Sequence, residues 1–178
     1  SVTLNDTALA WRSFYAATGD GAALDRAVAA VERAAALEPA DTIAAQNAAD
    51  LLAEAALRDV IGDAIDLHAM RLHANLGMVA FLYADAASRE AVVARIVAHP
   101  RIRSAVRLLD RVVLMAPDHA GALSTLASIH TLAGDAARLR ALAARMEGRQ
   151  PDVADCKRNS LAAYRGEEDP AARDDAER

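Results

Sequence analysis

The chain has 178 residues, of which 54% are apolar but only 3% aromatic, and its formal net charge is −5. This length favours a single domain with a substantial core over two domains. Alanine, the best helix former, supplies the apolar excess, and no segment alternates apolar and polar residues with a period of two. Composition therefore excludes a sheet-based fold and predicts an all-helical protein.

Targeting features are absent from the sequence. No uncharged apolar run approaches the roughly 18 residues of a membrane span, and Ser1–Leu4 lack the basic and apolar regions of a signal peptide. The single cysteine, Cys156, excludes an internal disulfide and agrees with a reducing compartment. We therefore expect a cytoplasmic protein with no membrane association.

Charge is unevenly distributed along the chain. Residues 1–88 hold 12 acidic and 5 basic residues (net −7), residues 89–165 hold 7 and 13 (net +6), and residues 166–178 hold 6 and 2 (net −4). The basic part can attract an acidic partner. Its arginines are not interleaved with the aromatic side chains on which bases stack, so nucleic acid is not favoured.

Helix-start and helix-stop residues predict nine helices. Thr7 or Asp6 can cap the first helix, the turn around Gly19 ends it, and Pro39 ends the second. The predicted helices cover residues 8–17, 22–37, 42–57, 61–83, 88–98, 102–115, 120–133, 136–146 and 152–164.

Two of these regions limit the predicted domain. The helix over residues 61–83 is extended and irregular, because Gly62 and Gly77 interrupt its pattern. Residues 166–178 lack large apolar side chains and are predicted to form a disordered acidic tail. The domain is therefore expected to comprise residues 1–165.

Prolines recur after similar alanine-rich segments, at Pro39, Pro117 and Pro151. The last two lie 34 residues apart, which is the period of a helix-turn-helix repeat, and the first interval of 78 residues equals two periods plus ten residues. We attribute that excess to the helix over residues 61–83. Apolar residues stand twelve, eight and five positions before each proline, where they are expected to pack against neighbouring helices: Ala27, Val31, Ala34, Ala105, Leu109, Val112, Leu139, Ala143 and Met146.

The chain resembles the tetratricopeptide repeat (TPR) family in this pattern of small and large apolar residues, a Gly-Asp turn and a closing proline. Ala120–Val153 resembles it best, with Leu123, Leu126, Ala127, Gly134, Asp135 and Pro151 in register. Residues 5–39 also match the repeat pattern if three extra residues are allowed after Gly19 and Asp20. Trp11 and Tyr15 then take the apolar and aromatic places of the first helix. Arg12 and Leu139 depart from the pattern, and residues 58–100 follow it poorly.

The resemblance implies a short right-handed solenoid of stacked antiparallel helix hairpins. First helices would line a concave face that binds an extended peptide or a partner helix. The groove-facing residues carried over from the family are Gln46, Asn47, Asp50, Ser124, Ser128 and Thr131, with Ile43 and Leu132 beside them. Family members that bind chaperone tails use a clamp of lysines, an arginine and asparagines, of which only Asn47 is matched, while Leu9 and Ser13 replace two others. Chaperone-tail recognition is therefore not expected.

Catalytic and metal-binding patterns receive little support. Asp66, His68 and His73 lie on one predicted helix, but the two histidines are five residues apart and point about 140° away from each other. Helix-surface histidines are the preferred interpretation, with a metal or enzymatic centre as the alternative. No G-x-S-x-G elbow and no glycine-rich phosphate loop occur. We expect a protein without cofactor, metal or enzymatic activity.

Two surfaces are candidates for interaction. Arg103, Arg107 and Arg111 recur every four residues, so they form one helical stripe, which is either a solvated face or a docking stripe for an acidic partner or a second copy. Trp11, Phe14 and Tyr15 are too close in sequence to face one core together, so at least one is expected to be exposed. A core or capping role is the preferred interpretation of these three residues, and an exposed aromatic interface is the alternative. The sequence thus predicts a non-enzymatic adaptor, scaffold or chaperone-like module, with a self-associating subunit as the alternative.

Overall fold

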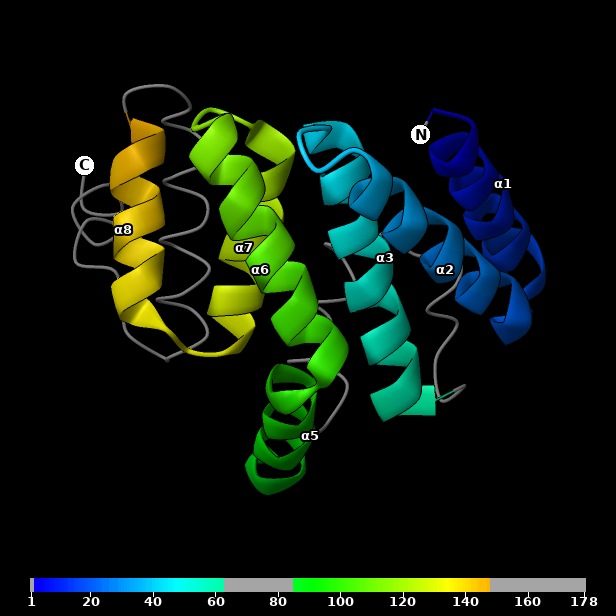
Figure 1. The fold of residues 1–178 in the computed structure, drawn as a ribbon. Helices are drawn as coiled ribbons and strands as arrows, with labels where there is room; N and C mark the ends of the chain where they lie inside the picture. The colour runs from blue at the N-terminus through cyan, green and yellow to red at the C-terminus, as the bar shows by residue number, and fades with distance from the viewer. Residues whose placement is uncertain (1, 63–84, 148–178) are drawn as a thin grey trace, which may run out of the picture.

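The computed structural model of the chain describes residues 2–62 and 85–147, and the regular structure in these two ranges is entirely helical (Figure 1). The helices are α1 (Val2–Thr18), α2 (Gly21–Leu37), α3 (Thr42–Ile61), α5 (Ala86–Ala98), α6 (Pro100–Met115), α7 (Ala120–Leu132) and α8 (Ala136–Glu147). The all-helical prediction is confirmed. The predicted helices over residues 61–83 and 152–164 and the tail over 166–178 fall largely or wholly outside the described residues.

Turn and cap residues produce the predicted breaks between helices. Gly19 follows α1 with φ of 70°, a conformation that glycine adopts without steric cost. The Asp20 carboxylate then accepts from the backbone N–H of Ala22 at 3.0 Å and caps α2. Asp41 caps α3 in the same way, and Pro39 lies between these two helices.

Helices α1 and α6 each begin earlier than the sequence predicts, for a local reason. The Thr7 hydroxyl donates to the Thr3 carbonyl at 2.7 Å, so Thr7 bonds inside α1 and does not cap a helix starting at residue 8. Pro100 is the first residue of α6, where its missing N–H costs nothing, and His99 Nδ1 accepts from the Arg101 N–H at 3.3 Å. The prediction assigned threonine to a helix cap and proline to a helix break. In the structure Thr7 lies inside a helix and Pro100 begins one.

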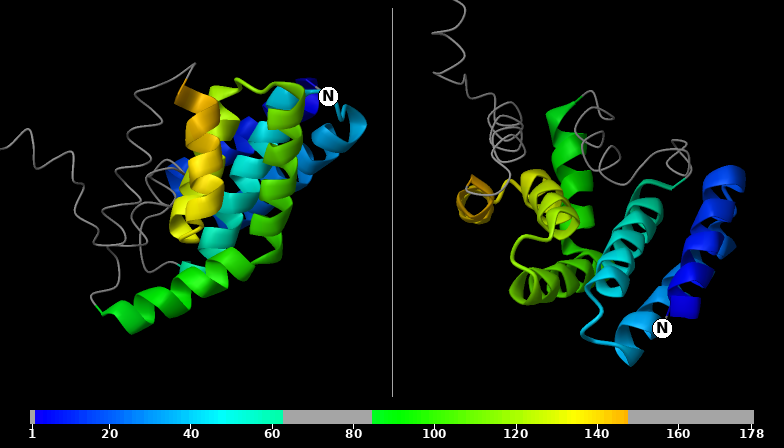
Figure 2. Two further views of the ribbon diagram at one scale, coloured as in Figure 1. Left: turned by 90° about the vertical axis from the view of Figure 1, so that its left-hand side faces the viewer. Right: turned by 90° about the horizontal axis from the view of Figure 1, so that it is seen from above.

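The helices form two layers. Seen from above, α1, α3 and α7 follow one another in one layer, and α2 and α6 lie in front of them (Figure 2). Helix α2 packs against α1 and α3, α6 packs against α3 and α7, and α8 packs against α7. Helix α5 crosses the lower ends of α3, α6 and α7 (Figure 1). Helix α3 is therefore the centre of the fold.

Helices α3 and α6 pack directly against each other although residues 62–99 separate them in the chain. The repeat prediction divided the 78 residues from Pro39 to Pro117 into two periods plus ten residues and did not predict this pairing. Every one of the nine positions counted back from the prolines is buried, none with more than 5% exposure. The packing role predicted for those positions is confirmed.

No described helix combines the length and apolarity that a membrane span requires.

An ion cluster joins α2, α3 and α6 at one end. Arg58 Nη2 lies 2.9 Å from Asp25 Oδ1, and Arg101 Nη1 lies 2.7 Å from Asp59 Oδ2. Cross-contacts of 3.4 Å and 3.5 Å, from Arg58 to Asp59 and from Arg101 to Asp25, complete the cluster. Each of the four charged groups thus lies near two groups of opposite charge, and the partly exposed cluster links α2, α3 and α6, where each such pair contributes about 0–1 kcal/mol.

Leu109 provides a test of the α3–α6 core. Its side chain has 0% exposure, so Leu109→Ala leaves a cavity and should lower the free energy of unfolding by about 2–5 kcal/mol. Leu114→Ala, on the same helix at 80% exposure, is the matched control and should change it by less than about 0.5 kcal/mol. Urea denaturation followed by circular dichroism measures both, and equal effects would contradict the observed burial.

Candidate functional site

Helices α1 and α3 are joined by two polar contacts with the same sequence offset. Asn47 Nδ2 donates to Asn5 Oδ1 at 2.8 Å, and Arg12 Nε donates to Glu54 Oε2 at 3.1 Å. Both pairs link residues 42 positions apart. A constant offset over two turns means that the helices run parallel in a fixed register.

Helices α3 and α7 repeat this arrangement. Thr125 Oγ1 donates to Asp50 Oδ1 at 3.0 Å, across an offset of 75 residues. Gln46 and Gly121 have the same offset, and the Gln46 side-chain amide lies where a Cβ on Gly121 would be. Glycine therefore permits this close approach. Helices α1, α3 and α7 are thus parallel, with polar side chains of α3 contacting both neighbours.

The six predicted groove residues lie on α3 and α7, but several are used in contacts between or within helices. Gln46, Asn47 and Asp50 are half-buried between neighbouring helices. The hydroxyls of Ser128 and Thr131 donate to the carbonyls of Ser124 and Ala127 in their own helix. The exposed side chains of α1 and α3 include two large apolar ones beside these contacts: Leu9 at 39% and Ile43 at 62%.

Glu54 is a charged residue that sequence reasoning missed. It is only 3% exposed, and its Oε1 atom has no hydrogen-bond partner among the described residues. Burial raises the pKa of the Glu54 carboxyl; Arg12 opposes this change, and Asp50 adds to it. The available signal was a single acid inside the apolar run Leu51–Leu57.

The arginine stripe is less uniform than its spacing suggests. Arg103 donates to the Ala98 carbonyl at the end of α5, and Arg107 Nη2 donates to Ser104 Oγ at 2.9 Å. Arg111 is half-buried, and its Nε and Nη2 atoms are inaccessible and have no acceptor among the described residues. The three arginines lie on one helix, α6, and among them Arg111 alone has buried donors without an acceptor in the described part of the chain.

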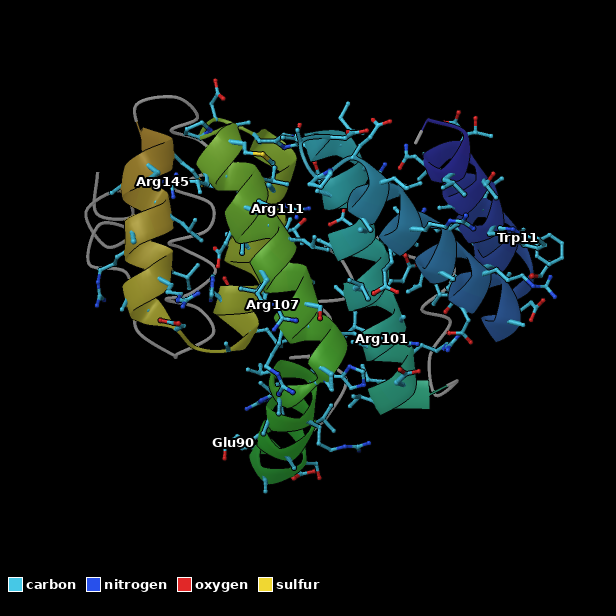
Figure 3. All side chains as sticks on the ribbon, in the orientation of Figure 1. Trp11, Glu90, Arg101, Arg107, Arg111 and Arg145 are labelled. Atoms are coloured by element: carbon cyan, nitrogen blue, oxygen red, sulfur yellow. The ribbon has the colours of Figure 1, made fainter. Side chains whose placement is uncertain are left out.

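Arg107 and Arg111 line a pocket of about 390 Å³ between α2 and α6, with α3 beneath it (Figure 3). Its lining residues are Glu32, Ala35, Ala36, Leu52, Ser104, Arg107, Leu108 and Arg111. The walls are largely aliphatic, and the charged groups are two arginines and one glutamate. Arg103, the third member of the stripe, does not line it.

The predicted aromatic interface divides between surface and core. Tyr15 has 4% exposure and belongs to the core, whereas Phe14 is 48% exposed. Trp11 is half-buried, its ring lies 6.1 Å from that of Phe14 in an edge contact, and Arg26 Cζ lies 4.7 Å from its centroid. The exposed aromatic surface therefore consists of Trp11 and Phe14, while Tyr15 stabilises the fold.

The alternative prediction is a metal or enzymatic centre at Asp66, His68 and His73, and these residues lie outside the described part of the chain. Within residues 2–62 and 85–147, no group of three or more potential ligands is close enough to hold a metal ion.

Glu54 should make stability pH-dependent. Because the folded-state pKa is raised, the folded protein binds more protons than the unfolded chain between the unfolded and folded pKa values. The contribution of Glu54 is therefore most favourable below the unfolded pKa of about 4.3 and is lost as the pH rises through the folded pKa. Relative to wild type, Glu54→Gln should gain stability as the pH rises from 4 to 8 in urea titrations. Parallel pH profiles for the two proteins would contradict a raised pKa.

Arg111 should lower the stability of the free protein. Replacing it by methionine retains an aliphatic stem and removes buried donors that lack an acceptor, so Arg111→Met should raise the free energy of unfolding by about 1 kcal/mol. Arg107→Met, at an exposed position of the same pocket, should change it by less than about 0.5 kcal/mol. Thermal and urea unfolding measure both, and a less stable Arg111→Met variant would contradict the expectation.

Comparison with protein-family models, with curated proteins and with solved structures finds no match to this chain. Its candidate surfaces are therefore defined by its own residues: the face formed by α1, α3 and α7, and the arginine-lined pocket between α2 and α6. The first combines exposed apolar side chains with amides. The second combines aliphatic walls with two guanidinium groups.

Proposed function

We propose that the chain is a non-enzymatic, TPR-like interaction module that binds a peptide or partner helix on the face formed by α1, α3 and α7. The constant offsets of 42 and 75 residues between these helices carry the proposal. Stacked repeats place their first helices parallel and in register, and the offsets are what such stacking produces.

The packing partners agree with three hairpins. Helices α1 and α2, α3 and α6, and α7 and α8 are the pairs, and each second helix except the last also contacts the next first helix. In this interpretation the 78 residues between Pro39 and Pro117 are one 34-residue period with an insertion between α3 and α6. Residues 58–100 then fit the repeat pattern poorly because most of them belong to this insertion.

The chemistry of this face suits a peptide. Leu9 and Ile43 are exposed apolar side chains one helical turn from the bonded pair Asn5 and Asn47, and therefore lie on the same sides of α1 and α3 as that pair. Amide groups can both donate to and accept from a peptide backbone, while the apolar side chains supply contact area. The exposed apolar area and the amide groups together support binding as the function of this face.

Selection from a random peptide library on the purified protein tests the proposal. Peptides that bind wild type should bind Ile43→Glu and Leu9→Glu at least about tenfold more weakly, because a charge replaces apolar contact area on the binding face. Leu114→Glu is the control at an apolar position of α6 that is more exposed than either, outside the proposed face, and it should bind normally. Isothermal calorimetry gives the affinities. The proposal would be refuted if the selected peptides bound both variants with unchanged affinity, or if no peptide were selected.

A further inference from the structure

Histidine side chains cap two neighbouring helices on one side of the molecule, α6 and α7 (Figure 1). His99 Nδ1 accepts from the backbone N–H of Arg101 at 3.3 Å, and His119 Nδ1 accepts from the backbone N–H of Ala122 at 3.4 Å. A backbone N–H can only donate, so Nδ1 carries no proton in either ring, and the proton of the neutral imidazole lies on Nε2. Both caps therefore require a neutral histidine.

Protonation of the two rings removes these caps. In an imidazolium ion both ring nitrogens carry protons, so Nδ1 can no longer accept, and the N-terminus of a helix repels the added positive charge. Histidine ordinarily changes its charge between about pH 5 and 8. The capped form binds fewer protons than the uncapped form, so acid in this range acts against the first turns of α6 and α7.

Helices α2, α3 and α5 are capped by aspartate instead. Asp20 accepts from the Ala22 N–H at 3.0 Å, and Asp41 accepts from the Ala44 N–H at 2.9 Å. Asp85 caps α5, and hydrogen bonding to the backbone lowers the pKa of its carboxyl. An aspartate carboxylate ordinarily takes up a proton only near a pH of about 4. We therefore expect these three caps to persist in the pH range in which the histidine caps are lost.

The charges around His99 limit what its protonation can gain. Its Nε2 atom lies 3.7 Å from Asp59 Oδ2 of α3, a contact that by itself favours the protonated ring. Asp59 also lies 2.7 Å from Arg101 and 3.4 Å from Arg58, and these groups together with Asp25 balance two positive against two negative charges. A protonated His99 adds one uncompensated positive charge to this cluster.

The surroundings of His119 offer less attraction to a proton. Among the described residues, histidine ion-pair contacts within 4.0 Å involve His99 and His130 but not His119. Asp118 precedes His119 in the turn before α7, and the neutral amide of Gln46 approaches the first turn of this helix from α3. An existing ion pair therefore does not offset the loss of the α7 cap.

His130 acts in the same direction where α7 meets α8. Its side chain is only 7% exposed, and burial lowers its pKa; Arg138 of α8 adds to this change, while Asp135 and Asp110 of α6 oppose it. Because the folded-state pKa is lowered, this contribution to stability is present above the unfolded value of about 6.5 and is lost as the pH falls through the folded value. Acid thus acts against a third histidine on the same side of the molecule.

We propose that the two histidine caps form an acid-sensitive device within the fold. Between about pH 7.5 and 5.5, protonation of His99 and His119 releases the first turns of α6 and α7, while the aspartate-capped first turns of α2, α3 and α5 are retained. Acid therefore loosens one side of the molecule without general unfolding. This device does not depend on what binds to the face of α1, α3 and α7.

Amide hydrogen exchange of the full chain, measured by NMR at about pH 7.5 and 5.5, tests the proposal. After correction for the intrinsic pH dependence of exchange, protection of the Arg101 and Ala122 amides should fall about fivefold at the lower pH, as expected for the loss of a typical helix cap. Protection of the Ala22 and Ala44 amides, which bond to the aspartate caps, should change less than about twofold.

Asparagine caps helices without titrating, so His99→Asn and His119→Asn are matched controls. The double variant should retain the protection of Arg101 and Ala122 at both pH values. Each single variant should restore only its own helix, so the comparison remains informative if the double variant does not fold. Ring-nitrogen NMR of the wild type at about pH 7.5 should place the proton on Nε2 of both histidines, with signals assigned by their loss in the single variants.

Three results would overturn the proposal. A proton on Nδ1 of either ring at the higher pH would exclude that histidine as a cap. Equal loss of protection at Arg101, Ala122, Ala22 and Ala44 would indicate general acid destabilisation. A loss at Arg101 and Ala122 that persists in the asparagine variants would assign the pH dependence to other groups.

Discussion

Close approach of helices to α3 is the constraint on which the rest of the structure depends. This helix contacts α1, α2, α5, α6 and α7, so it must accommodate neighbours around most of its circumference. Large side chains at every contact would separate the axes, whereas alanine lets two helices approach closely. The buried alanines of α3 are Ala44, Ala45, Ala48, Ala49, Ala53, Ala55 and Ala56. The unusual alanine content thus serves the packing of one central element as well as helix propensity.

Small side chains permit contact but do not determine register, because a smooth alanine surface can slide. The polar residues of α3 supply what alanine lacks: Asn47 and Glu54 contact α1, and Asp50 contacts α7. A shift by one residue would separate these pairs and leave buried polar groups without partners, which costs more than the bonds contribute. Burial raises the pKa of Glu54, and its ion pair with Arg12 links α3 to α1 in the observed register.

Local sequence patterns predicted the helices and the inward-facing positions, because both follow from periodicity and cap residues. The nine positions before the prolines are buried for this reason. Local patterns could not predict that α3 packs against α6. Residues 62–99 separate the two helices in the chain, and local sequence does not specify which distant helix packs against a given face. They also treated Arg103, Arg107 and Arg111 as equivalent. A helical stripe fixes only the direction of each side chain around the helix axis. The acceptors differ: Arg103 donates to the end of α5 and Arg107 to Ser104 of α6, whereas two buried donors of Arg111 have no acceptor among the described residues.

The two candidate surfaces differ in how their polar groups are satisfied, and this difference bears on function. On the face of α1, α3 and α7, most polar side chains already bond within the protein, so a ligand there must gain affinity from exposed apolar area and from the remaining amide capacity. Between α2 and α6, Arg111 keeps two buried donors unpaired, and the folded state bears that cost whether or not a ligand is present. Arg103 and Arg107 instead donate to acceptors of this chain. Members of one helical stripe can therefore differ in their contribution to stability although their spacing makes them equivalent in sequence.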